Sequence, residues 1–186
     1  MSLLALKDVA CVRGGRLLFE GVSLELEAGG TAIVTGRNGI GKSSLIRIAA
    51  GLLRPSAGDV RGERSALADE GLALDEKLTL GRALGFWAKL DGGDAGAGME
   101  AMGLAPLAEV PVRMLSTGQR KRAALARVVA SGAPLWLLDE PANGLDAEGL
   151  ERLGTAMARH RVEGGAILAA SHQDLPLAGA QEVKLG

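Results

Sequence analysis

Hydrophobic and polar positions along the chain form two alternating kinds of segment. Short apolar runs predict strands at 31–35, 135–138 and 166–170, each bounded on at least one side by Gly, Asp or Pro. In the helical segments apolar positions recur every three or four residues, which predicts helices over 117–130 and 147–161. Strands that alternate with helices in this way indicate an α/β domain with a mainly parallel sheet.

The N-terminal part has a different pattern. Strands are predicted at 3–12 and 22–26 on either side of a Gly14-Gly15 turn, and their short connection favours an antiparallel pair. From Lys42 onward the spacing becomes helical, and the chain is expected to break near Gly51. One face of this helix, at positions i, i+3, i+4 and i+7, consists of Leu45, Ile48, Ala49 and Leu52.

The middle of the chain predicts a small helical subdomain. Residues 78–90 read as a helix, 91–98 as a glycine-rich loop and 99–102 as a second short helix. Together with the helix at 117–130, which Ser116 can cap, these segments predict an insertion spanning roughly 66–130. The whole chain, 1–186, is expected to form one domain, since 186 residues is an ordinary domain length.

Composition and charge narrow the functions to be considered. Lys and Arg number 21 against 22 Asp and Glu, a net charge of −1, and the chain has no Tyr. Neither a strong basic field nor an aromatic stacking platform is present, so no nucleic-acid partner is expected. Cys11 is the only cysteine, and neither a signal peptide nor a membrane-spanning run is recognised. We therefore expect a soluble, cytoplasmic chain that docks on a membrane only through a partner.

A glycine-rich segment with the pattern G-x-x-x-x-G-K-[ST] lies between a predicted strand and a predicted helix. Triphosphate oxygens require close approach by backbone N–H groups, which glycines allow, and the helix N-terminus adds a positive dipole end. Lys42 is expected to contact the β- and γ-phosphates, and Ser43 to bind Mg²⁺. The alternative is an ordinary glycine turn without a ligand. The candidate residues for ATP are Gly36, Arg37, Asn38, Gly39, Ile40, Gly41, Lys42, Ser43 and Ser44.

Two further strands end in residues that suit phosphate chemistry. Asp139 and Glu140 follow the run at 135–138, and ligands of parallel sheets bind beyond the carboxyl ends of strands. Asp139 suits a Mg²⁺ ligand, and Glu140 suits the general base that polarises an attacking water. His172, just after 166–170, is placed to contact the γ-phosphate or that water. His160, on the preceding helix, is assigned a structural role.

The order of these motifs resembles the ATPase subunit of ABC transporters. Leu115-Ser116-Thr117-Gly118-Gln119 is similar to that family's LSGGQ motif, with Thr117 in place of a glycine. The stretch 142–146 looks like its D-loop, which ends at Asp146, and His172 looks like its switch histidine. The resemblance implies a P-loop NTPase fold with a RecA-like core, and it covers essentially the whole chain.

In that family two chains form a head-to-tail dimer with ATP sandwiched between them. The resemblance therefore implies that residues 115–119 contact nucleotide in trans, on a second copy of the chain. It also implies ATP and Mg²⁺ as cofactors, hydrolysis coupled to transport, and integral membrane permease subunits as partners. The expected location is then peripheral, at the cytoplasmic face of the inner membrane.

Three segments, 11–19, 78–92 and 115–127, are more narrowly similar to the ATP-binding subunit of haem exporters of cytochrome c biogenesis. This similarity implies CcmB-like and CcmC-like membrane partners and haem export or delivery. Two alternatives stay open: a dimerising nucleotide switch with little turnover, and the ATPase of an exporter for another substrate. Within 78–92, Phe86 and Trp87 are candidates for contact with the membrane partner, although a core role is equally compatible.

The sequence departs from the family in two places. The family's Q-loop glutamine, which touches Mg²⁺ and the transporter, has no counterpart in 69–73, where Asp69 or Glu70 could substitute. The aromatic residue that stacks on adenine is also missing. Arg13 is our candidate for that role, because a guanidinium plane can stack on a base.

Overall fold

The computed structural model describes residues 2–71 and 73–186; Met1 and Leu72, the latter inside the 69–73 segment, lie outside the described residues. Its elements, in order, are β1 (Ser2–Arg13), β2 (Arg16–Glu27), β3 (Thr31–Thr35), α1 (Lys42–Ala49), β4 (Ala57–Gly62), β5 (Ser65–Ala68), α2 (Leu80–Asp91), α3 (Ala95–Ala101), two short 3₁₀ turns (Ala105–Leu107 and Val112–Met114), α4 (Thr117–Ala130), β6 (Leu135–Asp139), α5 (Ala147–Val162), β7 (Ala166–Ala170) and β8 (Gln181–Lys184).

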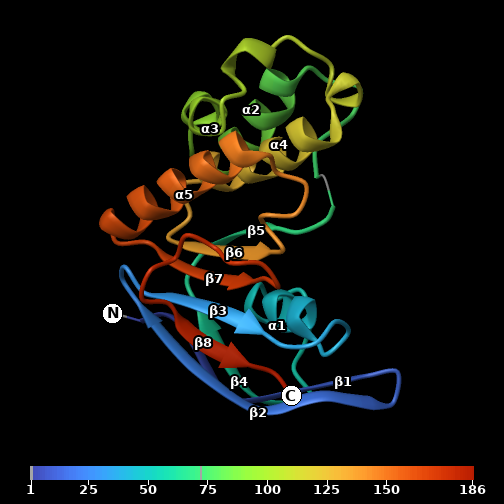
Figure 1. The fold of residues 1–186 in the computed structure, drawn as a ribbon, viewed down its shortest axis with the longest axis vertical. Helices are drawn as coiled ribbons and strands as arrows, with labels where there is room; N and C mark the ends of the chain where they lie inside the picture. Colours follow the sequence, from blue (N-terminus) through green and yellow to red (C-terminus); the bar gives the residue numbers. More distant parts are fainter. Residues whose placement is uncertain (1, 72) are drawn as a thin grey trace.

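A five-stranded parallel sheet, in the order β5-β6-β7-β3-β8, forms the centre of the molecule (Figure 1). A second, antiparallel sheet has the order β2-β1-β4. In Figure 1, α2, α3 and α4 lie together at the end of the molecule opposite the antiparallel sheet. The predicted fold class, with its parallel core, antiparallel N-terminal part and helical subdomain, is confirmed.

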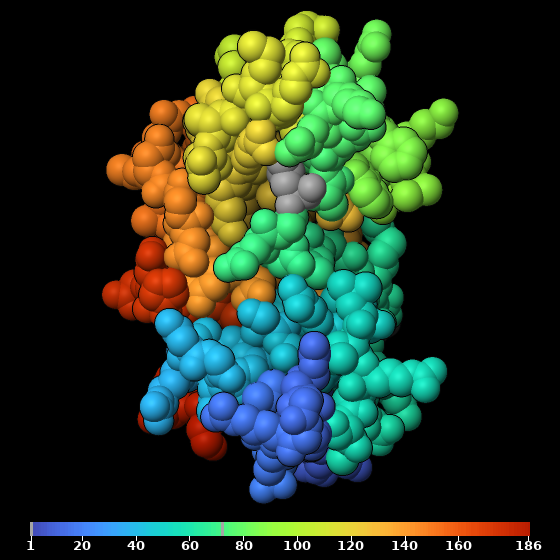
Figure 2. Space-filling view, turned by 90° about the vertical axis from the view of Figure 1, so that its right-hand side faces the viewer, coloured from blue at the N-terminus to red at the C-terminus, as the bar shows by residue number. Residues whose placement is uncertain are grey.

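The apolar runs of β6 and β7 are continuous because both faces of the central sheet are covered. Alternate residues of β6 belong to two different cores: Trp136 and Leu138 pack with α2, α4 and α5, whereas Leu135 and Leu137 pack with α1 and the antiparallel sheet. Burial on both faces is what makes such strands uniformly apolar. Figure 2 shows the N-terminal part, in blue, below the green and yellow helical segments.

Several predicted boundaries were wrong. β2 begins at Arg16, six residues earlier than predicted, and β4, β5 and β8 were missed. β4 and β8 are exposed and polar at most positions, so neither shows an alternating apolar pattern. β5 lies within the range predicted for the helical insertion but pairs with β6 in the central sheet. Leu52 was wrongly placed on one face of the helix with Leu45, Ile48 and Ala49: α1 ends at Ala49, and Leu52 is 69% exposed.

α3 begins inside the segment that was predicted as a loop. The Asp94 side chain caps its first turn by accepting hydrogen bonds from Gly96 N and Ala97 N. The glycines weaken intrinsic helix propensity but allow close packing, because a β-carbon at Gly98 would collide with the Ala126 carbonyl of α4. Tertiary contact therefore overrides the local sequence preference here.

Within residues 2–71 and 73–186, none of the helices combines the length and the hydropathy that a membrane-spanning helix needs.

Candidate active site

The phosphate loop connects β3 to α1 and leaves the start of this helix open. Gly41 is the N-cap, with φ 117°, and among the described residues no side chain caps the helix. No acidic residue lies in the first turn either. The N–H groups of that turn are thus available to an anion, and the helix dipole favours one.

Two glycines of the loop are required by close packing. Gly36 has φ 142°, and a β-carbon there would lie 2.7 Å from the Leu185 carbonyl oxygen after β8. At Gly41 a β-carbon would lie 2.8 Å from the Phe19 ring of β2. The loop is therefore held between both sheets, and a side chain at either glycine would displace it.

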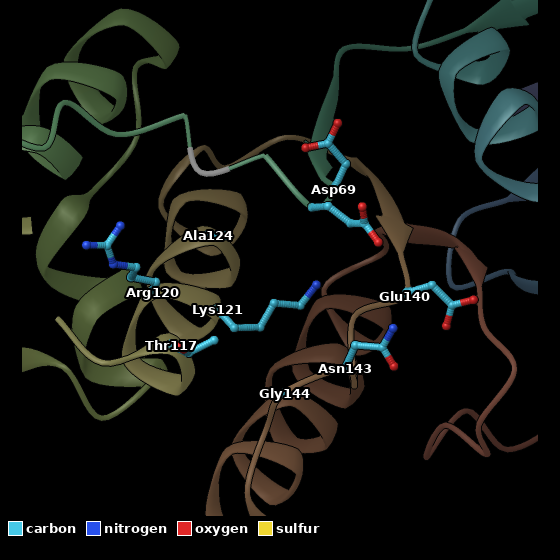
Figure 3. Close-up of a pocket in the computed structure, with 9 residues that line it drawn as sticks. Asp69, Thr117, Arg120, Lys121, Ala124, Glu140, Asn143 and Gly144 are labelled. Atoms are coloured by element: carbon cyan, nitrogen blue, oxygen red, sulfur yellow. The ribbon is translucent and has the colours of Figure 1, made fainter. Parts of the chain in front are cut away.

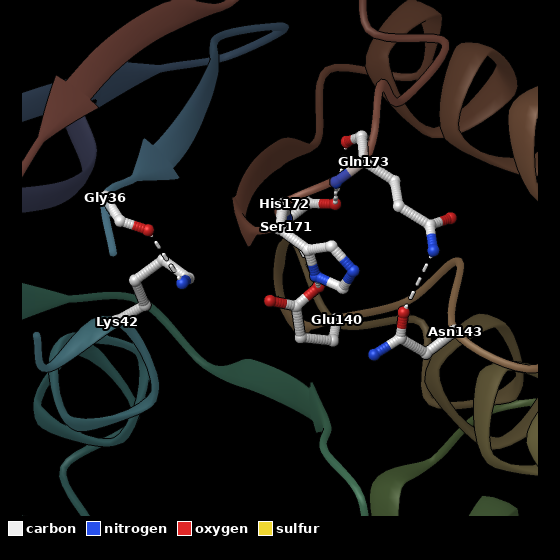
Figure 4. A network of polar contacts seen from close by, with 7 residues as sticks. All are labelled: Gly36, Lys42, Glu140, Asn143, Ser171, His172 and Gln173. Carbon is white, nitrogen blue, oxygen red and sulfur yellow. Dashed lines mark hydrogen bonds and ion pairs between the residues drawn. The ribbon is translucent and has the colours of Figure 1, made fainter. Parts of the chain in front are cut away.

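Lys42 is folded back into the loop. Its side chain is buried, and Nζ donates a hydrogen bond to the Gly36 carbonyl oxygen at 3.0 Å (Figure 4). The ammonium group is thus held within the curve of the phosphate loop, where an entering phosphate can exchange for the carbonyl contact.

Asp139, at the end of β6, is a buried acid with an unsatisfied oxygen. It is 4% exposed, and within the described part of the chain Oδ1 has no hydrogen-bond partner. Burial raises the pKa of this carboxyl, and the Ser43 hydroxyl acts in the opposite direction. A carboxylate oxygen and a hydroxyl side by side are ligands that suit Mg²⁺, and a cation would satisfy the orphaned oxygen. The residues present therefore fit this ion.

Glu140 and His172 form a direct pair. His172 Nδ1 lies 2.8 Å from Glu140 Oε2, and the same oxygen accepts the His172 backbone N–H at 3.3 Å (Figure 4). Glu140 has φ 47°, a left-handed conformation that costs a non-glycine residue on the order of 1–3 kcal/mol. Its backbone N–H donates to the Ala170 carbonyl at 2.8 Å, so the pairing of β6 with β7 continues through the turn and holds it.

Lys42, Glu140 and His172 line one cavity of about 370 Å³, which we call the phosphate cavity. The residues that line it come mainly from the phosphate loop, from the segment after β6 and from the segment after β7. Sequence reasoning placed most of them, including Asn38, Lys42, Ser43, Ser44, Glu140 and His172. It missed Leu18 of β2, and it left Glu70 and Asp69 as alternatives; Glu70 is the one that lines this cavity.

A polar contact joins the two segments that border the cavity. Gln173 Nε2 donates to Asn143 Oδ1 at 3.3 Å (Figure 4). Sequence reasoning gave Gln173 no role, although its position directly after His172 could have indicated one. The contact connects the segment after β6 with the segment after β7.

A neighbouring cavity of about 350 Å³ lies between the same strand ends and α4. Lys121 reaches into it from α4, opposite Asp69 and Glu140 (Figure 3). Arg120, on the same helix, is held by Glu76, whose Oε1 lies 2.8 Å from its Nη1. We call this the helical cavity.

Residues 115–119 do not line the phosphate cavity of their own chain. Ser116 and Gln119 form a capping box at the start of α4: Ser116 Oγ accepts from Gln119 N at 3.2 Å, and Gln119 Oε1 accepts from Ser116 N at 2.8 Å. Asp146 similarly caps α5, accepting from Gly149 N at 2.8 Å. The candidate trans contacts at 116–119 and the D-loop residue Asp146 therefore have local structural roles as well.

Arg13 lies at the exposed end of β1, paired with Arg16 across the turn. It is not among the residues around the phosphate cavity, whereas Leu18 of the same hairpin is. Its contact with adenine stays a prediction.

His160 has the structural position predicted for it. Its ring stacks on Trp136 with the ring centroids 3.9 Å apart, and burial lowers its pKa.

Trp87 is likewise held in place, since Nε1 donates to the Ala73 carbonyl at 2.6 Å and Arg127 lies 4.2 Å over its ring. Phe86, next to it, is 61% exposed.

Comparison with known proteins agrees with this geometry. The sequence profile of the ABC transporter family matches residues 19–143. The chain is 58% identical to the cytochrome c biogenesis ATP-binding export protein CcmA of Sphingopyxis alaskensis, over 99% of this chain and 97% of that protein. It is 59% identical to the protein of the same name from Novosphingobium aromaticivorans, over 91% of this chain and 88% of that protein. A solved ATP-binding subunit of an ABC transporter superimposes with a TM-score of 0.82 at 24% identity, over 91% of this chain and 79% of that one.

Proposed function

Since the chain belongs to the ABC transporter family, as an ATP-binding and ATP-hydrolysing subunit, we propose that it energises haem export or delivery for cytochrome c maturation. The observation that carries the catalytic part is the convergence of Lys42, Asp139, Glu140 and His172 at one edge of the central sheet. The transport part is supported by similarity to the CcmA proteins over nearly the whole chain.

Nucleotide binding is assigned to the phosphate loop and α1. The open N–H groups of the first turn and the Lys42 ammonium would hold the β- and γ-phosphates. Ser43 and Asp139 would hold Mg²⁺, which supplies positive charge to the phosphate oxygens when bound. Asp139 is buried and its Oδ1 is unsatisfied among the described residues, so binding would remove a cost present in the nucleotide-free chain.

Hydrolysis is assigned to Glu140 with His172 as its neighbour. Glu140 would accept a proton from the attacking water. Its left-handed backbone conformation ends the extended path of β6, and the residue lines the phosphate cavity. His172 lies 2.8 Å from one carboxylate oxygen, so it fixes the orientation of the carboxylate while the other oxygen remains available to water.

A second copy of the chain would complete the site. The capping box at 116–119 forms the start of α4, and its residues do not line the phosphate cavity of their own chain. In a head-to-tail dimer this turn would face the γ-phosphate bound by the partner copy. ATP would then stabilise the closed dimer, and hydrolysis would release it.

The proposed coupling surface is on α2 in the helical subdomain. Phe86 and Leu90 lie four residues apart on this helix and are 61% and 68% exposed, whereas Trp87 is bound within the fold. We assign Phe86 and Leu90 to contact with a CcmB-like or CcmC-like membrane subunit, at the cytoplasmic face of the inner membrane. Phe86→Ala should weaken co-purification with that subunit, and Val162→Ala, exposed at the end of α5, should not.

An ATPase assay of the full chain with its membrane partner tests the enzymatic proposal. Wild type should turn over, and Glu140→Gln should lose about 10²–10⁴-fold in rate, the usual contribution of a general base. ATP binding should persist in the variant. Equal inactivity of both proteins, even with the membrane partner present, would contradict the proposal.

A second candidate function is a nucleotide-dependent dimerising switch with little turnover. The absence of a glutamine in 69–73 favours it, because in the family that glutamine touches both Mg²⁺ and the transporter. ATP-dependent dimerisation without phosphate release would identify such a switch.

Transport of another substrate is tested by analysing which small molecule co-purifies with the membrane complex.

A further inference from the structure

We propose that Glu70 is a further residue of the nucleotide site, one that makes nucleotide binding depend more strongly on the divalent cation. Lys121 is its counter-charge across the helical cavity. The inference rests on the proposed function, since it takes Mg-ATP as the ligand of the phosphate cavity.

Position and bonding single out Glu70 from its neighbour. Asp69 is occupied: Oδ1 accepts the Gly71 N–H at 2.9 Å, and Oδ2 lies 3.8 Å from Arg47 Nη2. Glu70, in contrast, lines both the phosphate cavity and the helical cavity. Within residues 2–71 and 73–186 its carboxylate has no hydrogen bond or ion pair, and the residue is exposed. Glu70 is therefore free to turn toward a ligand in either cavity.

Lys121 is the cation that is available to balance this charge. Its neighbour Arg120 is already bound to the Glu76 carboxylate at 2.8 Å. The Lys121 side chain extends from α4 into the helical cavity (Figure 3). Partial burial lowers its pKa, and the nearby carboxylates, Asp139 and Glu70 among them, offset only part of this shift. Across the described residues it forms no ion pair, so its charge is available to attract the Glu70 carboxylate across this cavity.

An extra carboxylate at this place has opposite effects on the two forms of the nucleotide. Metal-free ATP is a polyanion, and Glu70 repels it. When Mg²⁺ neutralises part of that charge and adds a cation at the Ser43 and Asp139 end, the repulsion falls and attraction to the ion replaces it. Lys121 attracts the Glu70 carboxylate toward the helical cavity and away from the phosphates, so it should aid metal-free nucleotide binding most where Glu70 is present.

The test measures ATP binding to the full chain by titration calorimetry, in EDTA and in excess Mg²⁺. The readout is the ratio of the dissociation constant in EDTA to the dissociation constant in excess Mg²⁺. Glu70→Gln should tighten binding of metal-free ATP and lower this ratio roughly three- to tenfold, the effect of one charge acting near a protein surface. Glu109→Gln, an exposed acid that lines neither cavity, is the matched control and should leave the ratio unchanged.

A double-mutant cycle tests the pairing with Lys121. Lys121→Gln should weaken metal-free binding in the wild type by several-fold and much less in the Glu70→Gln background. Thermal unfolding of each variant verifies that it is folded.

The outcomes separate this inference from the proposed function. A wild type that binds ATP equally with and without Mg²⁺ contradicts the magnesium part of the proposed function. A wild type that prefers Mg-ATP, together with an unchanged ratio in Glu70→Gln, overturns the role of Glu70. Strict additivity of the two substitutions overturns the role of Lys121.

Discussion

The starts of α1 and α4 are both candidate anion sites, but they are built in opposite ways. α1 begins at Gly41 without a side-chain cap among the described residues, so its first N–H groups are open. α4 begins with the Ser116–Gln119 capping box, which satisfies the N–H groups of these two residues from within the chain. One helix start is prepared for a ligand in its own chain, and the other is stable without one.

This difference indicates how a shared site can be assembled. The open start lies beside an unsatisfied Asp139 oxygen and therefore gains most when nucleotide and metal arrive. The capped start gains less, because a ligand must compete with existing hydrogen bonds. We expect nucleotide to bind the α1 side first and the α4 side only when a second copy closes over it.

The largest expected effect is at the open start. Lys42→Ala should weaken ATP binding by about ten- to a hundredfold, because it removes a charged donor from the phosphate loop. Lys89→Ala, an exposed lysine of α2, is the control and should bind normally. Retained affinity in Lys42→Ala, measured by titration calorimetry, would show that the loop is not the site.

The capped start can be tested by removing its cap. Ser116→Ala should lower stability by about 1 kcal/mol and should also reduce dimer turnover, while the monomer still binds ATP. Asp94→Ala removes the comparable cap of α3, which faces neither cavity, so it should lose stability but keep its turnover. Equal turnover in both variants would reduce Ser116 to a structural cap.

Asp139 provides a smaller effect with a defined pH dependence. Burial raises its pKa in the folded chain, so its negative charge opposes folding above that pKa, and the penalty vanishes as the pH falls below the unfolded value of about 3.9. Asp139→Asn should therefore raise the melting temperature slightly at pH 7 in EDTA. The gain should shrink toward pH 4 and should reverse in Mg-ATP, which only the wild type binds fully. A gain independent of pH would contradict this account.

The smallest effect is expected at the rim of the open site. Arg13→Ala should weaken ATP binding about two- to fivefold, as loss of an exposed cation–π contact does. Arg16→Ala, across the same turn, should have no effect. Unchanged affinity in Arg13→Ala would leave adenine to apolar residues such as Leu18, which lines the cavity.

Local patterns were sufficient for the parts of the fold that are buried on both sides. β3, β6 and β7 were predicted within a residue, and so was the capped start of α4, because continuous apolar runs and a capping box are encoded over a few positions. The edge strands β4 and β8 were missed, since their stability comes from neighbouring strands rather than from their own residues. α3 was misplaced for the same reason, because its glycines are tolerated only against α4.

The sequence by itself determined the chemistry at the strand ends: the phosphate loop, the acidic pair and His172 follow from residue types at fixed spacings. The tertiary structure alone decided which remaining side chains share their cavity. Asp69 and Glu70 are neighbours in the chain, yet one is bound by Arg47 and the other faces the phosphate cavity. Spacing along the chain fixes what a segment can do, but the direction of a loop side chain depends on partners far away in sequence.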